Sequence, residues 1–203
     1  MNETKIRLSE QEMEMVVNAG IILTKNSIIK KAGLLLADLQ QSFHTIIQNE
    51  QYNLPLELMN SSAKISKGEN YEGLPYLILD YPRYFTKPDI FAIRTMFWWG
   101  NFFSLTLHLS GKCKFDLASQ LQNAYSILQN AGFLVSSGEN EWMHHFEKNN
   151  YTVMDAGFET EFKIKTEKER FIKLAKQYPL NSWHEVKGLL EKDFKLLTGV
   201  CFR

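Results

Sequence analysis

The sequence predicts an α+β fold, in which a mostly antiparallel sheet of about five to seven strands is packed by N-terminal, central and C-terminal helices. Apolar residues recur at three- and four-residue steps in the first third of the chain, whereas Pro, Gly and aromatic residues dominate after Ala63. Helical spacing returns after Gly111 and near the C-terminus. This order favours an antiparallel over a doubly wound parallel sheet, and the lack of a Pro-, Gly- or Ser-rich linker predicts one domain, residues 1–203.

Two helices are predicted in the first third. Ser9 and Glu12 form a capping-box pattern, and Met13, Val16 and Val17 supply a stripe that we expect to face the core. The second helix spans about residues 27–48, where one face is apolar. Its apolar residues are Ile28, Ala32, Leu35, Leu36, Leu39, Phe43, Ile46 and Ile47.

The middle of the chain predicts strands. A turn is expected at residues 67–70 and a central strand at 74–80. Two longer strands follow at about residues 90–98 and 102–110, joined into a hairpin by Trp99-Gly100-Asn101, because Gly and Asn tolerate positive φ.

The length of this hairpin loop decides which side chains share a face. With a two-residue turn, one face holds Arg94, Met96 and Trp98 with Phe103, Leu105 and Leu107, and the other holds Thr95 and Phe97 with Ser104, Thr106 and His108. A three-residue loop regroups them, so both arrangements stay open.

The second half predicts a helix, short strands and two closing helices. The helix spans residues 116–131 and ends at Gly132, and strands are expected at 133–136, 151–154 and 159–165. The closing helices are predicted from two further capping-box patterns. These are Thr166 with Glu169 before Phe171, Leu174 and Ala175, and Ser182 with Glu185 before a helix that ends at Gly199.

Composition excludes several classes of protein. Lys plus Arg and Asp plus Glu are equal at 23 each, so the sequence predicts neither a nucleic-acid nor a membrane partner. Cys113 and Cys201 lack metal-ligand spacing, and no phosphate-binding or nucleophile motif occurs. The start of the chain lacks a signal-peptide pattern, and no apolar stretch is long enough to cross a bilayer. We therefore expect a soluble, cytoplasmic protein without a cofactor.

The densest feature of the sequence is aromatic: eleven aromatic residues lie in the thirty-three positions from Tyr71 to Phe103. Trp98 and Trp99 point to opposite faces of any strand that contains both, so a core on one side of the sheet cannot bury both rings. Helices covering both faces of the sheet explain the cluster structurally. Alternatively, one Trp lines a pocket or a subunit interface.

Arg94 and His108 are the second candidate, because each interrupts an apolar or hydroxyl-bearing strand where an unpaired charge is costly. Together they are suited to hold a carboxylate or phosphate, with His108 as an acid or base. A half-exposed strand face with Ser104 and Thr106 explains His108 equally well. Arg83 has the same standing, since pairing with Asp80 or another carboxylate also accounts for it.

Two further patterns resemble metal sites. Glu141 and His145 share a face if residues 139–147 are helical, but two ligands do not make a zinc site. Asp155 with Glu161 and Lys163 matches a nuclease-like spacing that arises often by chance. No metal site is predicted.

Two functional hypotheses remain. The first is a noncatalytic binding or assembly protein, forming a homo-oligomer such as a homodimer, or binding a small apolar ligand, through the hairpin with Trp98 and Trp99. The alternative is a small-molecule enzyme acting on an anionic substrate through a pocket with His108, Arg94 and Arg83. The predicted ligand-binding residues are accordingly Arg83, Arg94, Trp98, Trp99 and His108.

Overall fold

The computed structural model describes residues 6–50 and 52–203, which form an α+β fold around a seven-stranded antiparallel sheet, as predicted. The strands are β1 (Lys64–Tyr71), β2 (Leu74–Thr86), β3 (Asp89–Trp98), β4 (Phe102–Ser110), β5 (Leu134–Ser136), β6 (Tyr151–Val153) and β7 (Phe171–Pro179). Their spatial order is β1-β2-β3-β4-β7-β5-β6, so β7 lies between β4 and β5. The four long strands β2, β3, β4 and β7 are therefore neighbours.

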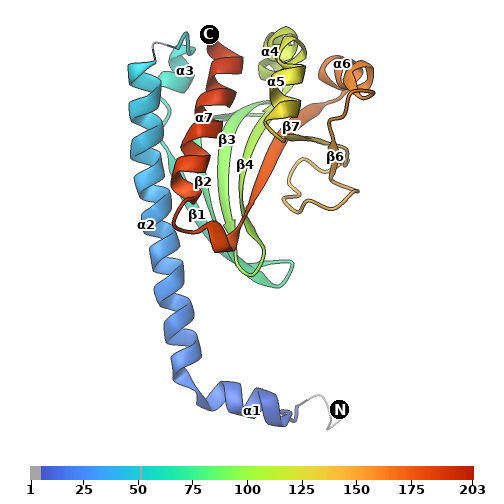
Figure 1. The fold of residues 1–203 in the computed structure, drawn as a ribbon. Helices are drawn as coiled ribbons and strands as arrows, with labels where there is room; N and C mark the ends of the chain where they lie inside the picture. The colour runs from blue at the N-terminus through green and yellow to red at the C-terminus, as the bar shows by residue number, and fades with distance from the viewer. Residues whose placement is uncertain (1–5, 51) are drawn as a thin grey trace.

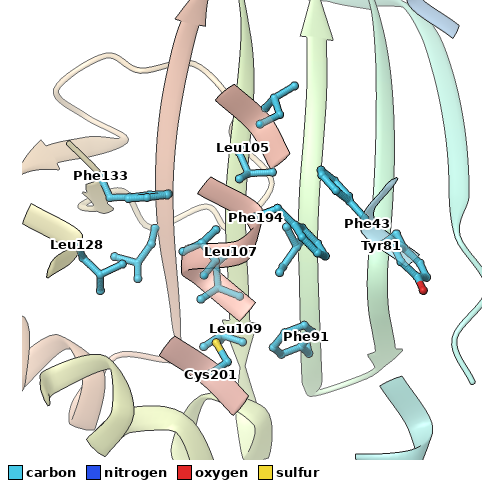
Figure 2. Close-up of a cluster of buried hydrophobic side chains, with 14 of the residues drawn as sticks. Phe43, Tyr81, Phe91, Leu105, Leu107, Leu109, Leu128, Phe133, Phe194 and Cys201 are labelled. Carbon is cyan, nitrogen blue, oxygen red and sulfur yellow. The ribbon is translucent and has the colours of Figure 1, made fainter. Parts of the chain in front are cut away.

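The helices of the described chain, apart from the first, pack on one face of the sheet (Figure 1). The helices are α1 (Glu10–Val17), α2 (Ala19–Asn49), α3 (Leu56–Met59), α4 (Gly111–Asn123), α5 (Tyr125–Asn130), α6 (Glu159–Lys168) and α7 (Val186–Phe202), with a 3-10 turn at Leu180–Ser182. Phe43 of α2 stacks on Phe194 of α7 with ring centroids 3.8 Å apart, over the strands drawn in Figure 2. Both rings are fully buried, as are Leu105 and Leu107 of β4 beneath them.

The central hairpin has a three-residue loop, because Trp98 pairs directly with Phe102 and Asn101 N–H bonds to the Trp98 carbonyl. Gly100 takes a φ of 71°, which suits a residue without a Cβ. The facing derived from a two-residue turn is therefore wrong. Arg94 shares a face with His108, while Phe97 lies on the opposite, helix-covered face with Phe103.

The predictions for residues 159–179 are wrong for both elements. Residues 159–165 form the start of α6, which buries Phe162 and Thr166 four positions apart. The predicted helix after Thr166 is strand β7, buried on both faces along most of its length. A strand buried on both faces shows no clean alternation, so its apolar spacing resembles that of a helix.

Other boundaries shift by a few residues. Residues 67–70 belong to β1 rather than to a turn, and β2 runs beyond Asp80 to Thr86. The predicted 116–131 helix begins at Gly111 and is divided into α4 and α5, and Gly132 follows with φ 79°, as expected for a stop. The last helix begins at Val186 without a side-chain cap and ends at Phe202, beyond Gly199.

The N-terminal capping box is present, since Ser9 Oγ accepts from Glu12 N–H and the Glu12 carboxylate accepts from Ser9 N–H. The expected burial of the α1 stripe is wrong: Met13 is 50% and Val17 73% exposed. Figure 1 shows the reason, because α1 and the beginning of α2 extend past the body of the protein. No helix in the described ranges is long and apolar enough to span a membrane.

Candidate ligand-binding face of the sheet

The second face of the sheet carries a buried group of polar side chains. Its strands contribute Asp80 from β2, Arg94 from β3, Ser104, Thr106 and His108 from β4, and Lys173 from β7. The registers bring them together, because Arg94 is the cross-strand neighbour of both Asp80 and Thr106, and His108 is that of Lys173. Sheet pairing alone thus gathers three ionisable groups from β3, β4 and β7.

Residues 137–150, which connect β5 to β6 without helix or strand, cover this face; we call them the covering segment. The Tyr71 hydroxyl accepts hydrogen bonds from the backbone N–H groups of His144 (2.8 Å) and His145 (3.2 Å). The ring of Trp142 lies edge-on to the His108 ring, 5.4 Å between centroids. Phe146 packs against Phe102. The segment is thus held mainly by side chains.

Asp80 and Arg94 form a bidentate ion pair. Arg94 Nε and Nη2 donate to the two Asp80 carboxylate oxygens at 2.7 and 3.0 Å. The Asp80 and Arg94 side chains are only 8% and 11% exposed, so water stabilises neither charge and each is stabilised by the other. The Trp142 ring covers the outer side of the guanidinium at 5.8 Å.

Glu141, on the covering segment, reaches the sheet and lies between two basic residues. Its Oε2 is 3.1 Å from His108 Nε2 and its Oε1 is 3.3 Å from Arg170 Nη2. Burial, and next the positive charges of Arg94 and Lys173, lower the pKa of His108 to about 3. His108 is therefore neutral at physiological pH, and the tautomer protonated on Nε2 donates to Glu141.

Lys173 is 2% exposed. Its ammonium donates to the Met143 carbonyl at 2.7 Å and to Asn150 Oδ1 at 3.1 Å, and it lies 4.9 Å from the centre of the Tyr151 ring. Burial, reinforced by Arg94, lowers the pKa of Lys173 to about 7, although Glu141 acts in the opposite direction. The amine therefore exchanges its proton near neutral pH.

The part of this face nearer the hairpin loop is apolar. Ile78, Met96, Trp98 and Phe102 form a small separate core there. Trp98 is 5% exposed, and its Nε1–H has no hydrogen-bond partner among the described residues. A buried donor without an acceptor is uncommon in folded proteins.

A pocket of about 390 Å³ opens at the edge of the polar group. It is lined by Ser136, Ser137, Gly138, Glu139, Lys165, Glu169, Arg170 and Phe171. Arg170 connects the pocket to Glu141, and the Phe171 ring lies 6.2 Å from the His108 ring. A second pocket, of about 280 Å³ near Cys113 and Phe202, contains none of the side chains of the polar group. The pocket beside Arg170 is therefore the one that adjoins the candidate site.

The five predicted site residues do not form one cluster. Arg94 and His108 lie on the same face, as the anionic-site hypothesis requires. Arg83 pairs with Ala92 but its Nε donates to the Ser62 carbonyl at 2.8 Å. Trp98 is buried, and Trp99 is half-buried on the opposite face against Phe97.

Sequence reasoning missed Lys173 and the role of Glu141. Lys173 falls in the helix that the sequence predicts after Thr166, but the structure has a buried strand there, β7. Glu141 was paired with His145 on a helix, but residues 137–150 are irregular and Glu141 contacts His108 instead. Within the described ranges, no three His, Cys, Asp or Glu side chains are grouped closely enough to hold a metal ion.

Known proteins supply no comparison for this arrangement: no protein-family model, curated protein sequence or solved structure matches the chain.

Proposed function

We propose that this protein binds a small anionic molecule, a carboxylate or a phosphate, at the position that the Glu141 carboxylate occupies between His108 and Arg170. The observation that carries the proposal is this placement of an internal carboxylate between an N–H donor of the sheet and a guanidinium. Glu141 belongs to an irregular segment, so it can leave without disturbing the strands.

The surrounding charges favour an anion once Glu141 moves away. The buried Arg94 and Lys173 then face one buried carboxylate, that of Asp80, in a region largely shielded from water. Electrostatic attraction is stronger there than at an exposed surface. Arg170 adds a positive charge at the exposed edge, where Glu139 and Glu169 also line the pocket. The adjoining pocket of about 390 Å³ lies within the size range of small-molecule sites and has room for the rest of the ligand.

The test removes the internal carboxylate. In a Glu141→Ala variant, we expect inorganic phosphate and small dicarboxylates to bind more tightly than to the natural chain, measured by isothermal titration calorimetry. Glu147→Ala is the matched control, since Glu147 is exposed on the same segment. It removes the same charge and is expected to leave anion binding unchanged.

A second substitution checks the location of the site. Adding Arg170→Met to Glu141→Ala is expected to abolish the gain, because the anion loses its guanidinium partner. Arg170 is largely exposed, so the change does not threaten the fold. Anion binding that is no tighter in Glu141→Ala than in Glu147→Ala, or that persists without Arg170, contradicts the proposal.

An enzyme acting on an anionic substrate is the second candidate, and Lys173 favours it. Because its pKa is about 7, much of the amine is uncharged at neutral pH and can attack a carbonyl carbon, releasing water and leaving an imine. Adding pyruvate and cyanoborohydride to Glu141→Ala would reduce that imine to a stable adduct, which peptide mass spectrometry locates. An adduct on Lys173 supports catalysis, whereas anion binding without an adduct supports a binding protein.

A further inference from the structure

The N-terminal part of the chain forms an apolar helical arm, which we define as residues 6–24. Nine large apolar side chains of the arm are between 44% and 78% exposed. They are Ile6, Leu8, Met13, Met15, Val16, Val17, Ile21, Ile22 and Leu23. None of the eight residues of α1 is buried, so the body of the protein does not cover this surface.

The arm begins where α2 leaves the sheet. Lys25 of α2 forms an ion pair with Glu69 of β1 at 2.6 Å, and the first buried residue of α2 is Ala32. Figure 1 shows the residues before this point extending beyond the strands, with α1 turned at an angle to α2. Much of the apolar surface of the arm is therefore left uncovered by the described part of the chain.

The size of the exposed surface matches a protein interface. At about 60 Å² for each half-exposed side chain, the nine residues present on the order of 500 Å² of apolar surface. A standard interface buries about 800 Å² on each partner, of which somewhat more than half is apolar. Monomeric proteins rarely leave so large an apolar patch uncovered.

The charges of the arm and of the adjacent turns of α2 identify the partner. Glu10, Glu12 and Glu14 lie on α1, which has no basic residue, whereas α2 has three lysines and no acidic residue before Asp38. In a two-fold dimer, the acidic α1 of each copy can lie against the basic first part of α2 in the other copy. The two opposite charges of one chain then form two equivalent attractive contacts between the chains.

The spacing of side chains agrees with this pairing. Leu23, Lys30 and Leu34 follow one another at seven- and four-residue steps on the side of α2 opposite the buried Ala32 and Leu36. Leu34 is 62% and Leu23 67% exposed, although both are large and apolar. On α1, Met13 and Val17 lie one turn apart and are flanked by Glu10 and Glu14. Each stripe thus combines apolar residues with one sign of charge.

We propose that the protein forms a homodimer in which α1 of each copy packs antiparallel on residues 23–34 of α2 in its partner. Met13 and Val17 of one copy contact Leu23 and Leu34 of α2 in its partner, and Glu14 faces Lys30. This contact is independent of the anion site, because the arm lies away from the covering segment.

The first test measures self-association of the full chain by sedimentation equilibrium. We expect a concentration-dependent dimer whose Kd rises at least about tenfold in Val17→Asp, since a buried charge replaces an apolar contact. Val153→Asp is the matched control, because Val153 is 63% exposed on β6 and lies outside the arm. Circular dichroism confirms that both variants keep their helices and strands.

A charge exchange distinguishes a second copy from any other partner. Glu14→Lys alone is expected to weaken the dimer, because it places two positive charges together at each contact. Glu14→Lys with Lys30→Glu is expected to restore the dimer, because each contact between the two copies again joins opposite charges. The proposal is overturned if the chain is a monomer at all concentrations, if Val17→Asp and Val153→Asp have equal effects, or if the exchange fails to restore association.

Discussion

Acid is expected to destabilise this protein through two histidines, His108 on the covered face of the sheet and His144 on the covering segment. Burial, together with the positive charges of Arg94 and Lys173, lowers the pKa of both His108 and His144 from 6.5 to about 3. As the pH falls below 6.5, each imidazole takes up a proton in the unfolded chain but stays neutral in the folded protein. The unfolded state binds more protons in this window, so the free energy of unfolding decreases as the pH decreases.

The size of the effect follows from these pKa values. Between about pH 7 and about pH 5, each histidine lowers the free energy of unfolding by about 2 kcal/mol, and the pair by about 4 kcal/mol. Folded domains have a total stability of about 5–15 kcal/mol, so this loss is large. Most carboxylates titrate below about pH 5, so a fall in the free energy of unfolding between about pH 7 and about pH 5 is assigned to histidine.

Urea denaturation at both pH values measures the prediction. With an m-value of about 2 kcal/mol per molar urea, the midpoint should fall by about 2 M in the natural chain and by about half as much in His108→Gln or His144→Gln. His184→Gln, at an exposed position, is the control and is expected to keep the full fall. If the midpoint of the natural chain hardly moves, or if His108→Gln and His144→Gln behave like His184→Gln, the two imidazoles are not held neutral by the fold.

Two further predictions concern stability and are measured by the same denaturation assay near neutral pH. Arg94→Met should cost about 3–5 kcal/mol because Asp80 stays buried without its partner, whereas Arg94→Met with Asp80→Leu should recover most of the loss; an equal loss in the double variant contradicts this. Gly111→Ala should destabilise by more than Gly73→Ala, although both have positive φ, because only at Gly111 does a Cβ meet neighbouring atoms, among them the Pro88 carbonyl oxygen at 2.8 Å. Equal losses would show that the backbone around Gly111 relaxes.

The amphipathic helices and the strands that are bounded by clear turn residues can be predicted from the sequence. The buried face of α2 is read directly from Ala32, Leu36, Leu39 and Phe43, and the boundaries of β3 and β4 follow from the turn at Gly100. Residues 159–179 do not follow, because the alternating charges at the start of α6 imitate a strand and the doubly buried β7 imitates a helix. Local patterns encode which residues are buried, but β7 is buried by neighbours far away in the chain.

The candidate site shows the same division. Arg94 and His108 are conspicuous in the sequence because they interrupt apolar strands. Their common face depends on one extra residue in the hairpin loop, since side chains alternate along a strand and a shift of one position moves them to the other face. The burial of Lys173 could not be predicted from the sequence, because it depends on the pairing of β7 with β4.

Access to the proposed anion site requires the covering segment to open, and its contacts set how often this occurs. Six side-chain hydrogen bonds hold it to the sheet and to Arg170: two to Tyr71, two from Lys173, and those of Glu141 with His108 and Arg170. At about 1 kcal/mol each, opening costs about 6 kcal/mol before the gain in chain entropy is counted. The open form is then a minor state, and the apparent affinity for an anion is reduced in proportion to its population. Glu141→Ala removes two of the six hydrogen bonds and also the internal carboxylate that competes with the anion. The same substitution should therefore increase both hydrogen exchange of the covering segment and anion affinity, whereas a purely structural role for Glu141 predicts faster exchange alone.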